Sequence, residues 1–141
     1  MYLLDTNILI YAYRDLGGCR QRLEAHNAAD IHISAINIAE IEYGIAKLSR
    51  PEGLRLFLSG VQSRYALQPM SAQAARQAGQ LRAALERQGQ HMGPYDLLIA
   101  GIALANNLTV ITRNTREFER VPGLRVENWL ALKEASAAVQ G

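Results

Sequence analysis

Short β-type segments alternate with longer helical segments along most of the 141-residue chain. The β-type segments are predicted at residues 2–5, 31–34, 65–69, 108–112 and, as a strand or a turn, 124–129. The helices are predicted at residues 6–15, 19–30, 35–49, 51–62, 71–89 and 94–107. Such alternation is typical of a parallel sheet whose strands are connected by helices. It predicts an α/β fold in three layers, α/β/α, with a short parallel sheet flanked by helices.

The length and composition favour one globular domain that spans residues 1–141. Apolar residues make up 49% of the chain and charged residues 20%, which is ordinary for a globular protein. Cys19 is the only cysteine, so no internal disulfide is possible. No basic targeting segment and no apolar run of about 18 residues is present. We therefore expect a cytoplasmic protein that does not enter a membrane.

Asp5 interrupts an apolar run in "MYLLDTNILIYAY". It follows the first predicted strand directly, and ligands of open parallel sheets bind beyond the carboxyl ends of the strands. The alternative role is that of an N-cap for the helix that begins at Thr6. Both roles place Asp5 at the same edge of the sheet.

Two more acids lie in apolar helical segments. Glu40 belongs to "AINIAEIEYGIAKLS", whose isoleucines cover much of the helix circumference and predict a buried helix. The alternative for Glu40 is a solvated side chain paired with Lys47. Asp96 precedes the apolar run "LLIAGIALA", within which Ala100 and Ala103 form a small face for a closely packed neighbour. The alternative for Asp96 is an acid of the first helical turn that interacts with the helix dipole.

Polar residues also follow the strand "LTVIT", in the segment "RNTREFER". Thr112, Asn114, Glu117 and Glu119 lie just beyond the carboxyl end of that strand. We expect at most one helical turn there. A solvated surface loop is the alternative for each of these residues taken singly.

Taken together, the isolated acids predict a cation site. Acids are seldom buried unless they are paired or bind a metal, and converging carboxylates raise one another's pKa until a cation neutralises them. Oxygen ligands favour Mg²⁺ or Mn²⁺, and the three scattered histidines give no zinc-type spacing. Thirteen of the fifteen cationic residues are arginine, whose planar group matches phosphate. If four of the thirteen acids belong to a metal site, the rest of the chain has fifteen cationic and nine acidic residues. This excess of positive charge suits a polyanionic partner.

Four segments resemble those of the PIN-domain family and, within it, the VapC ribonuclease toxins of bacterial toxin–antitoxin pairs. The segments are "LLDTNILI", "SAINIAEIEYG", "GPYDLLIAGIALANNLTVITRNTREFERV" and "GLRVENW". The resemblance implies a PIN-like α/β/α nuclease domain. It also implies that Asp5, Glu40 and Asp96 are catalytic residues that bind the metal, with Asp5 and Asp96 as direct ligands.

A fourth acid of the family lies in the loop after the fourth strand, where this chain has Asn114 nearest the strand. We expect Glu117 to replace it as a catalytic residue. Thr6, Thr112 and Asn114 are expected to support the site.

The resemblance implies an Mg²⁺-dependent endoribonuclease toxin, with Mn²⁺ as a substitute, that cleaves structured RNA and is neutralised by a VapB-type antitoxin. It favours tRNA over ribosomal RNA as the substrate. It also implies a homodimer and a hetero-oligomer with the antitoxin. Arg113 and Arg116 border the site and are expected to contact flanking phosphates of the RNA, with loop solvation as the alternative.

Two other functions remain open at this point. One is a catalytically idle PIN-like module that binds RNA or protein. The other is a haloacid-dehalogenase-like phosphatase. That class needs a second Asp two residues after the first, where this chain has Asn7, and a downstream Lys.

Overall fold

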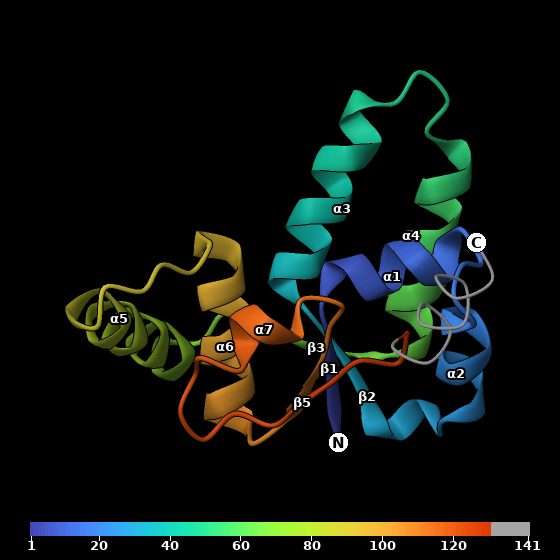
Figure 1. Ribbon diagram of the computed structural model, residues 1–141. Coiled ribbons are helices and arrows are strands. Elements are labelled where there is room, and N and C mark those ends of the chain that lie inside the picture. The colour runs from blue at the N-terminus through green and yellow to red at the C-terminus, as the bar shows by residue number, and fades with distance from the viewer. Residues whose placement is uncertain (131–141) are drawn as a thin grey trace, which may run out of the picture.

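All five strands form one parallel sheet in the order β3-β2-β1-β4-β5 (Figure 1). The computed structural model describes residues 1–130, so residues 131–141 of the predicted domain lie outside the described residues. The strands are β1 (Tyr2–Leu4), β2 (Ile31–Ser34), β3 (Ala66–Gln68), β4 (Thr109–Ile111) and β5 (Val126–Glu127). The predicted parallel sheet is confirmed.

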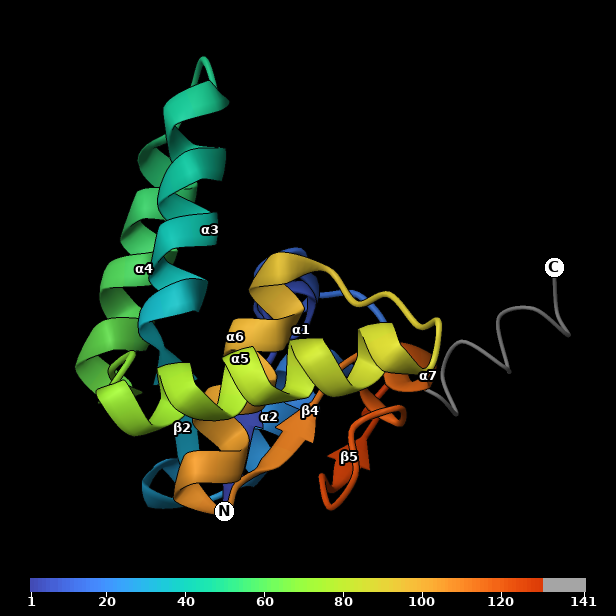
Figure 2. The ribbon, with the colours of Figure 1, turned by 90° about the vertical axis from the view of Figure 1, so that its left-hand side faces the viewer.

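Helices connect the strands and cover both faces of the sheet (Figures 1 and 2). They are α1 (Thr6–Tyr13), α2 (Cys19–Ala25), α3 (Ala35–Lys47), α4 (Glu52–Arg64), α5 (Ala72–Arg87), α6 (Pro94–Asn106) and α7 (Thr115–Phe118). Leu4 and Ile111 point to the layer that contains α1 and α2. Leu3 and Val110 point to the layer that contains α5 and α6. The three-layer α/β/α prediction is confirmed.

The helix predicted at residues 19–30 is wrong in its second half. Helix α2 ends at Ala25, and a separate 3-10 turn, η1, follows at Ala28–Asp30. His26 has an extended backbone, and its ring stacks on Trp129 with ring centroids 4.4 Å apart. A contact with a residue near the other end of the described chain thus terminates the helix.

Helices α3 and α4 form a hairpin that projects away from the sheet (Figures 1 and 2). Because only its inner side packs on the core, α3 buries Ile36, Asn37, Ile41 and Ile45 and leaves its outer side exposed. The prediction that α3 is buried nearly all round is therefore wrong. The loop between the hairpin's helices lies at the end of the hairpin that is farthest from the sheet (Figures 1 and 2).

Helix α6 is locked against α5 by a very close approach. A Cβ atom on Gly101 would lie only 2.5 Å from the backbone oxygen of Ala74, so only glycine fits there. Ala100 and Ala103 are buried, as predicted, on either side of this position. The packing fixes the start of α6, which carries Asp96. None of the helices within residues 1–130 is long and apolar enough to cross a membrane.

Candidate active site

The site lies where β1 and β4 end side by side at the carboxyl edge of the sheet. The chain turns from β1 into α1 at Asp5, and the Asp5 backbone N–H donates to the Ile111 carbonyl at 2.8 Å. Strand β1 lies between β2 and β4. The chain therefore continues to one side of β1 through β2 and β3, and to the other side through β4 and β5. Ligands of parallel sheets bind at such a switch point.

Asp5 is the N-cap of α1, and its second carboxylate oxygen faces the end of β4. Its Oδ1 accepts a hydrogen bond from the Thr6 backbone N–H at 2.8 Å and caps α1. Its Oδ2 accepts a hydrogen bond from the Thr112 hydroxyl at 2.7 Å. The residue is only 4% exposed. Burial raises the pKa of Asp5, and the charges of Glu40 and Glu117 add to this, while the bonds from Thr112 and Thr6 oppose it.

Glu40 is held at the site by a chain of side chains from two elements. The Thr6 hydroxyl donates to Glu40 Oε1 at 2.8 Å, and Asn37 Nδ2 donates to the Thr6 hydroxyl oxygen at 2.9 Å. Asn37 in turn forms a capping box with Ser34 at the start of α3. The alternative pairing of Glu40 with Lys47 is wrong: no ion pair of residues 1–130 includes Glu40, and the Lys47 ammonium lies over the Tyr43 ring.

Asn37 was not singled out from the sequence. The signal was present in "SAIN", because a polar residue three positions after a serine cap completes a capping box. Asn37 is fully buried. It connects the start of α3 to Thr6 and, through Thr6, to Glu40.

Asp96 and Glu117 meet next to Gly93. Glu117 Oε1 accepts a hydrogen bond from the Gly93 backbone N–H at 2.8 Å. A Cβ atom on Gly93 would lie 3.8 Å from Asp96 Oδ2 and 3.8 Å from Glu117 Oε1. Burial, the charge of Asp5 and the hydrogen bond with Glu117 raise the pKa of Asp96 to about 8, with further contributions from the charges of Glu117 and Glu40. The Asp96 carboxyl group therefore tends to hold its proton near neutral pH when no cation is bound.

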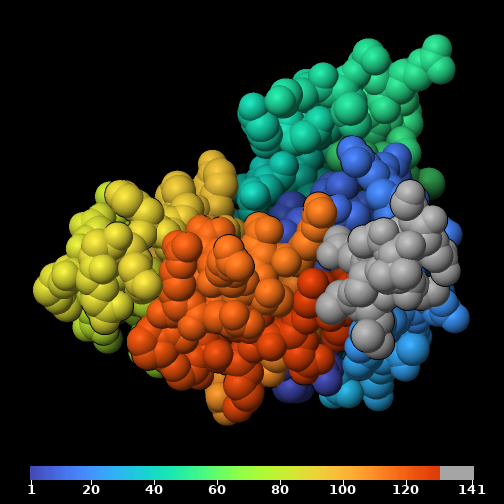
Figure 3. Space-filling view, viewed as in Figure 1, coloured from blue at the N-terminus to red at the C-terminus, as the bar shows by residue number. Residues whose placement is uncertain are grey.

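A surface depression, the acidic hollow, joins the three acids predicted to bind metal. Its lining residues are Asp5, Thr6, Asn7, Ile10, Tyr11, Glu40, Asp96 and Asn114. Figure 3 shows the surface hollowed where α3, α6 and the segment before α7 meet. Asn7 and Tyr11 line this hollow although the sequence did not single them out. Both lie on α1, two and six residues beyond Asp5.

A second depression, the basic hollow, adjoins the acidic one. Its lining residues are Arg113, Asn114, Thr115, Arg116, Glu117 and Arg120. The structure thus places Arg113 and Arg116 beside the site, as the sequence predicted. Arg113 lies over the Tyr11 ring and donates to the Tyr11 hydroxyl, and its backbone N–H donates to Asn7 Oδ1 at 3.3 Å.

Asn114 and Glu117 occupy different parts of the site. The Asn114 backbone N–H donates to the Thr112 hydroxyl oxygen at 2.9 Å, and its side chain lines both hollows. Glu117 contacts Asp96 from α7, which is a single helical turn as predicted. Glu119 is exposed one residue beyond the end of α7. The carboxylate closest to the other acids in this loop is therefore that of Glu117.

The chemistry of the donors fits a hard divalent cation. Carboxylate, amide and hydroxyl oxygens surround the acidic hollow, and such ligands suit Mg²⁺ or Mn²⁺. Within residues 1–130, no three acidic, histidine or cysteine side chains converge closely enough to hold a metal ion in their present positions. Burial, together with the charges of neighbouring acids, nevertheless raises the pKa values of Asp5 and Asp96. A cation bound there would offset the negative charges that help to raise the pKa of Asp96.

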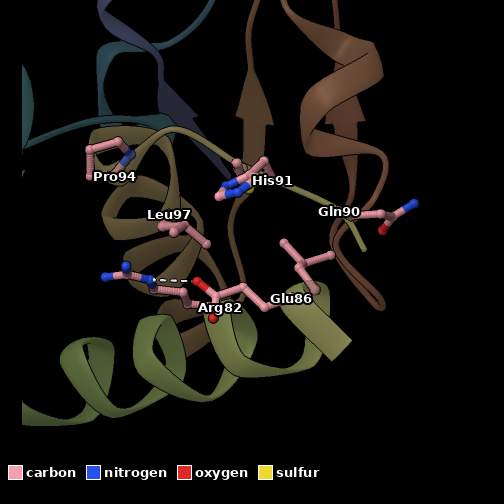
Figure 4. A pocket seen from close by; sticks show the side chains of 8 residues that line it. Arg82, Glu86, Gln90, His91, Pro94 and Leu97 are labelled. Atoms are coloured by element: carbon pink, nitrogen blue, oxygen red, sulfur yellow. Dashed lines mark hydrogen bonds and ion pairs between the residues drawn. The ribbon is translucent and has the colours of Figure 1, made fainter. Parts of the chain in front are cut away.

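Another pocket lies behind the start of α6, away from these acids (Figure 4). Its lining residues are Arg82, Leu85, Glu86, Gln90, His91, Met92, Pro94 and Leu97. Arg82 and Glu86 already form an ion pair at 3.1 Å. This pocket therefore offers no group of unpaired acids comparable with the acidic hollow.

The family model described as "PIN domain" matches residues 2–124 of this chain. The chain belongs to the PIN-domain family. Its similarity to curated proteins places it among the VapC ribonucleases of that family. The tRNA(fMet)-specific endonuclease VapC of Shigella flexneri is 41% identical over 129 residues, which cover 91% of this chain and 97% of that protein. Ribonuclease VapC2 of Rickettsia felis is 40% identical over 132 residues, which cover 92% of this chain and 98% of that protein.

Solved structures agree with this membership. DNA-bound VapBC from Salmonella typhimurium matches with a TM-score of 0.84 at 40% identity, over 91% of this chain and 97% of that one. VapBC2 from Rickettsia felis, bound to a DNA fragment from its promoter, matches with a TM-score of 0.83 at 38% identity, over 91% and 98%. The predicted family is confirmed, and the phosphatase alternative is wrong because this chain belongs to a different family.

Proposed function

We propose that this PIN-domain ribonuclease is the toxin of a toxin–antitoxin pair and that it cleaves tRNA with Mg²⁺ as its native cofactor and Mn²⁺ as a substitute. The observation that carries the proposal is the meeting of Asp5, Glu40, Asp96 and Glu117 from four elements at the switch point of the sheet. Initiator tRNA is the first candidate substrate, because VapC relatives from Shigella flexneri and Salmonella typhimurium are named tRNA(fMet)-specific endonucleases.

The proposed roles follow from the contacts. A bound Mg²⁺ would supply a water of lowered pKa and offset the negative charge of the phosphate. Asp5 and Asp96 would hold the ion directly, and Glu40 would bind it directly or through water. Thr112 and Thr6 fix the orientation of the Asp5 and Glu40 carboxylates by the hydrogen bonds described above.

Glu117 completes the proposed acidic cluster next to Asp96. Its bond to the Gly93 N–H keeps the carboxylate beside the start of α6. Arg113 and Arg116 line the adjoining basic hollow and would contact phosphates that flank the cleaved bond. Asn114 would be a neutral support at the boundary of the two hollows.

The proposed partner is a VapB-type antitoxin encoded with this chain. Several related solved structures are VapBC complexes, two of them bound to DNA, which supports this proposal. An antitoxin arginine placed among the acids would occupy the position of the cation and so block the site. We also propose a single cytoplasmic domain over residues 1–141, a homodimer and a hetero-oligomer with the antitoxin. Co-purification from the intact operon and sedimentation at micromolar concentration test these assemblies.

The function is tested with purified protein, initiator tRNA transcript and a Mn²⁺ titration under single-turnover conditions. We expect cleavage that requires the metal and disappears in Asp96→Asn. Elongator methionine tRNA is the matched substrate control. Metal-independent cleavage, or full activity of Asp96→Asn, would refute the proposed chemistry. Binding of tRNA without cleavage at any metal concentration would favour the idle PIN-like module.

The cellular substrate is tested by mapping new RNA 5′ ends soon after induction in a bacterial host. We expect the earliest ends to fall within tRNA. Early ends confined to ribosomal RNA would overturn the choice of substrate but leave the nuclease activity intact. The same experiment with Asp96→Asn identifies ends that arise without the proposed activity.

A further inference from the structure

Two neighbouring depressions extend the acidic hollow in opposite directions. Asn114 lines both the acidic and the basic hollow. Glu40 lines both the acidic hollow and a third one, the aromatic hollow, which it shares with Ala39, Tyr43 and Tyr95. The three form one continuous track in the order basic, acidic, aromatic. A chain that follows this track meets arginines first, then the acids, then two tyrosines.

The two tyrosines are unusually exposed for large aromatic side chains. Tyr43 is 66% exposed and Tyr95 is 55% exposed. They come from different helices, Tyr43 from the outer side of α3 and Tyr95 from the first turn of α6. Neither contributes to the two buried cores. Both rings line the same hollow beside Glu40, and both residues are more than half exposed there.

The outer side of α3 continues this track with a cation. Glu40, Tyr43 and Lys47 are spaced by three and four residues, so they follow one another along the same face of the helix. The Lys47 ammonium lies 4.9 Å from the centre of the Tyr43 ring. With increasing distance from the site, this face of α3 therefore presents a carboxylate, then an aromatic ring, then a positive charge.

We propose that Tyr43 and Tyr95 form a base-stacking subsite for the nucleotide next to the cleaved phosphate, with Lys47 contacting the phosphate beyond it. The proposal rests on the ribonuclease function above. Single-stranded nucleic acids bind where a cationic groove follows the backbone and aromatic rings stack on the bases. Unpaired bases of RNA loops are recognised in the same way. The basic hollow would hold the strand on the other side of the acids.

A second copy of this chain is the competing occupant of the aromatic hollow. An interface there would bury Glu40, because this residue lines the hollow together with the two tyrosines. Continuity with the acidic and basic hollows favours RNA, since its backbone can span all three. The two occupants are distinguished by binding and by oligomeric state.

The test is single-turnover cleavage of initiator tRNA with increasing concentrations of the full-length protein. Replacing Tyr43 or Tyr95 with alanine should raise the half-saturating protein concentration about 5- to 150-fold, the range for loss of one stacked base. The rate at saturation should change little. Tyr43→Phe retains the ring and should behave like wild type. Leu56→Ala removes an exposed apolar side chain from α4, away from the three hollows, and is the matched control.

A modified substrate shows whether the lost contact is to a base. Once the cleavage position is mapped, an abasic nucleotide is placed on either side of the cleaved bond in two separate RNAs. One abasic RNA should bind wild type as weakly as the normal RNA binds Tyr43→Ala, and combining the two changes should add little further loss. Additive losses for both abasic RNAs, or wild-type binding by both alanine variants, would overturn the subsite.

Oligomeric state and metal binding complete the test. We expect Tyr43→Ala to keep the sedimentation behaviour and the Mn²⁺ affinity of wild type. If the variant dissociates wild-type dimers, the aromatic hollow is a protein interface and the proposal is wrong. If only the subsite proposal is wrong, the wild-type protein still cleaves RNA with Mn²⁺. Failure of wild type to cleave any RNA with Mn²⁺ would overturn the proposed function and the subsite with it.

Discussion

The charge state of Asp96 should make the metal-free protein less stable as the pH rises. Its pKa is about 8 in the folded protein, against an ordinary value of 3.8. Between these values the folded state holds a proton that the unfolded chain has released, so the free energy of unfolding falls with increasing pH. Each pH unit changes it by at most about 1.4 kcal/mol, which gives a ceiling of roughly 6 kcal/mol. Because Asp96 is partly exposed, solvent screening reduces the effect to on the order of 2 kcal/mol.

The Asp96→Asn variant keeps the shape of the side chain but removes this titration. Urea unfolding in a metal chelator at fixed ionic strength, at pH 5, 7 and 9, measures the difference. The free energy of unfolding of wild type should fall relative to the variant by about 2 kcal/mol between pH 5 and pH 9. The variant should be the more stable protein at pH 9. Glu119→Gln removes an exposed acid and should follow wild type at each pH. Parallel pH profiles for wild type and Asp96→Asn would refute the reasoning.

Further predictions concern the metal and the fourth acid. Mn²⁺ at a hundredfold excess over its dissociation constant should stabilise wild type by about 2.7 kcal/mol in thermal melts, and the Asp5→Asn/Asp96→Asn double variant should lose this response; equal shifts would count against the site. Glu117→Gln should severely reduce single-turnover cleavage, whereas Glu119→Gln should change it little; wild-type cleavage by Glu117→Gln, with an inactive Asn114→Ala, would assign the fourth position to Asn114. Asn114→Asp should preserve or raise Mn²⁺ affinity in calorimetric titrations, since it adds a carboxylate to the lining of the acidic hollow; a clear loss of affinity would place Asn114 outside the metal's surroundings.

The sequence predicted the layers and the position of the site because both depend on local patterns. Apolar strands alternate with amphipathic helices, and in a parallel sheet the residues just after each strand gather at one edge. Asp5 and Thr112 each follow their strand directly, so their proximity could be inferred without knowing any side-chain contact. The grouping of Glu40 and Asp96 with Asp5 rested on their apolar surroundings and on the family resemblance, because helix periodicity alone does not orient α3 or α6 toward that edge.

Features that depend on contacts between distant segments could not be predicted. The end of α2 at Ala25 depends on the stacking of His26 on Trp129, which follows it by more than a hundred residues. The exposed side of α3 results from its projection beyond the sheet, which no pattern within the helix reports. Its isoleucines gave the same periodicity signal that a fully covered helix would give.

The hydrogen bonds that start the helices also orient the acids. Asp5 caps α1 with one oxygen and accepts from Thr112 with the other. Asn37 belongs to the capping box of α3, and its amide holds the Thr6 hydroxyl that donates to Glu40. The start of α6 follows the same rule, since the Gly93 N–H at its N-cap donates to Glu117.

The starts of α1, α3 and α6 each share a hydrogen bond with a carboxylate of the site or with a side chain that holds one, so rotation of any of these three helices about its axis would move an acid. The arrangement makes the acids rigid even where they repel one another, as the raised pKa of Asp96 indicates. Under the proposed function, a cation held among these acids would offset their repulsion and so stabilise the folded protein.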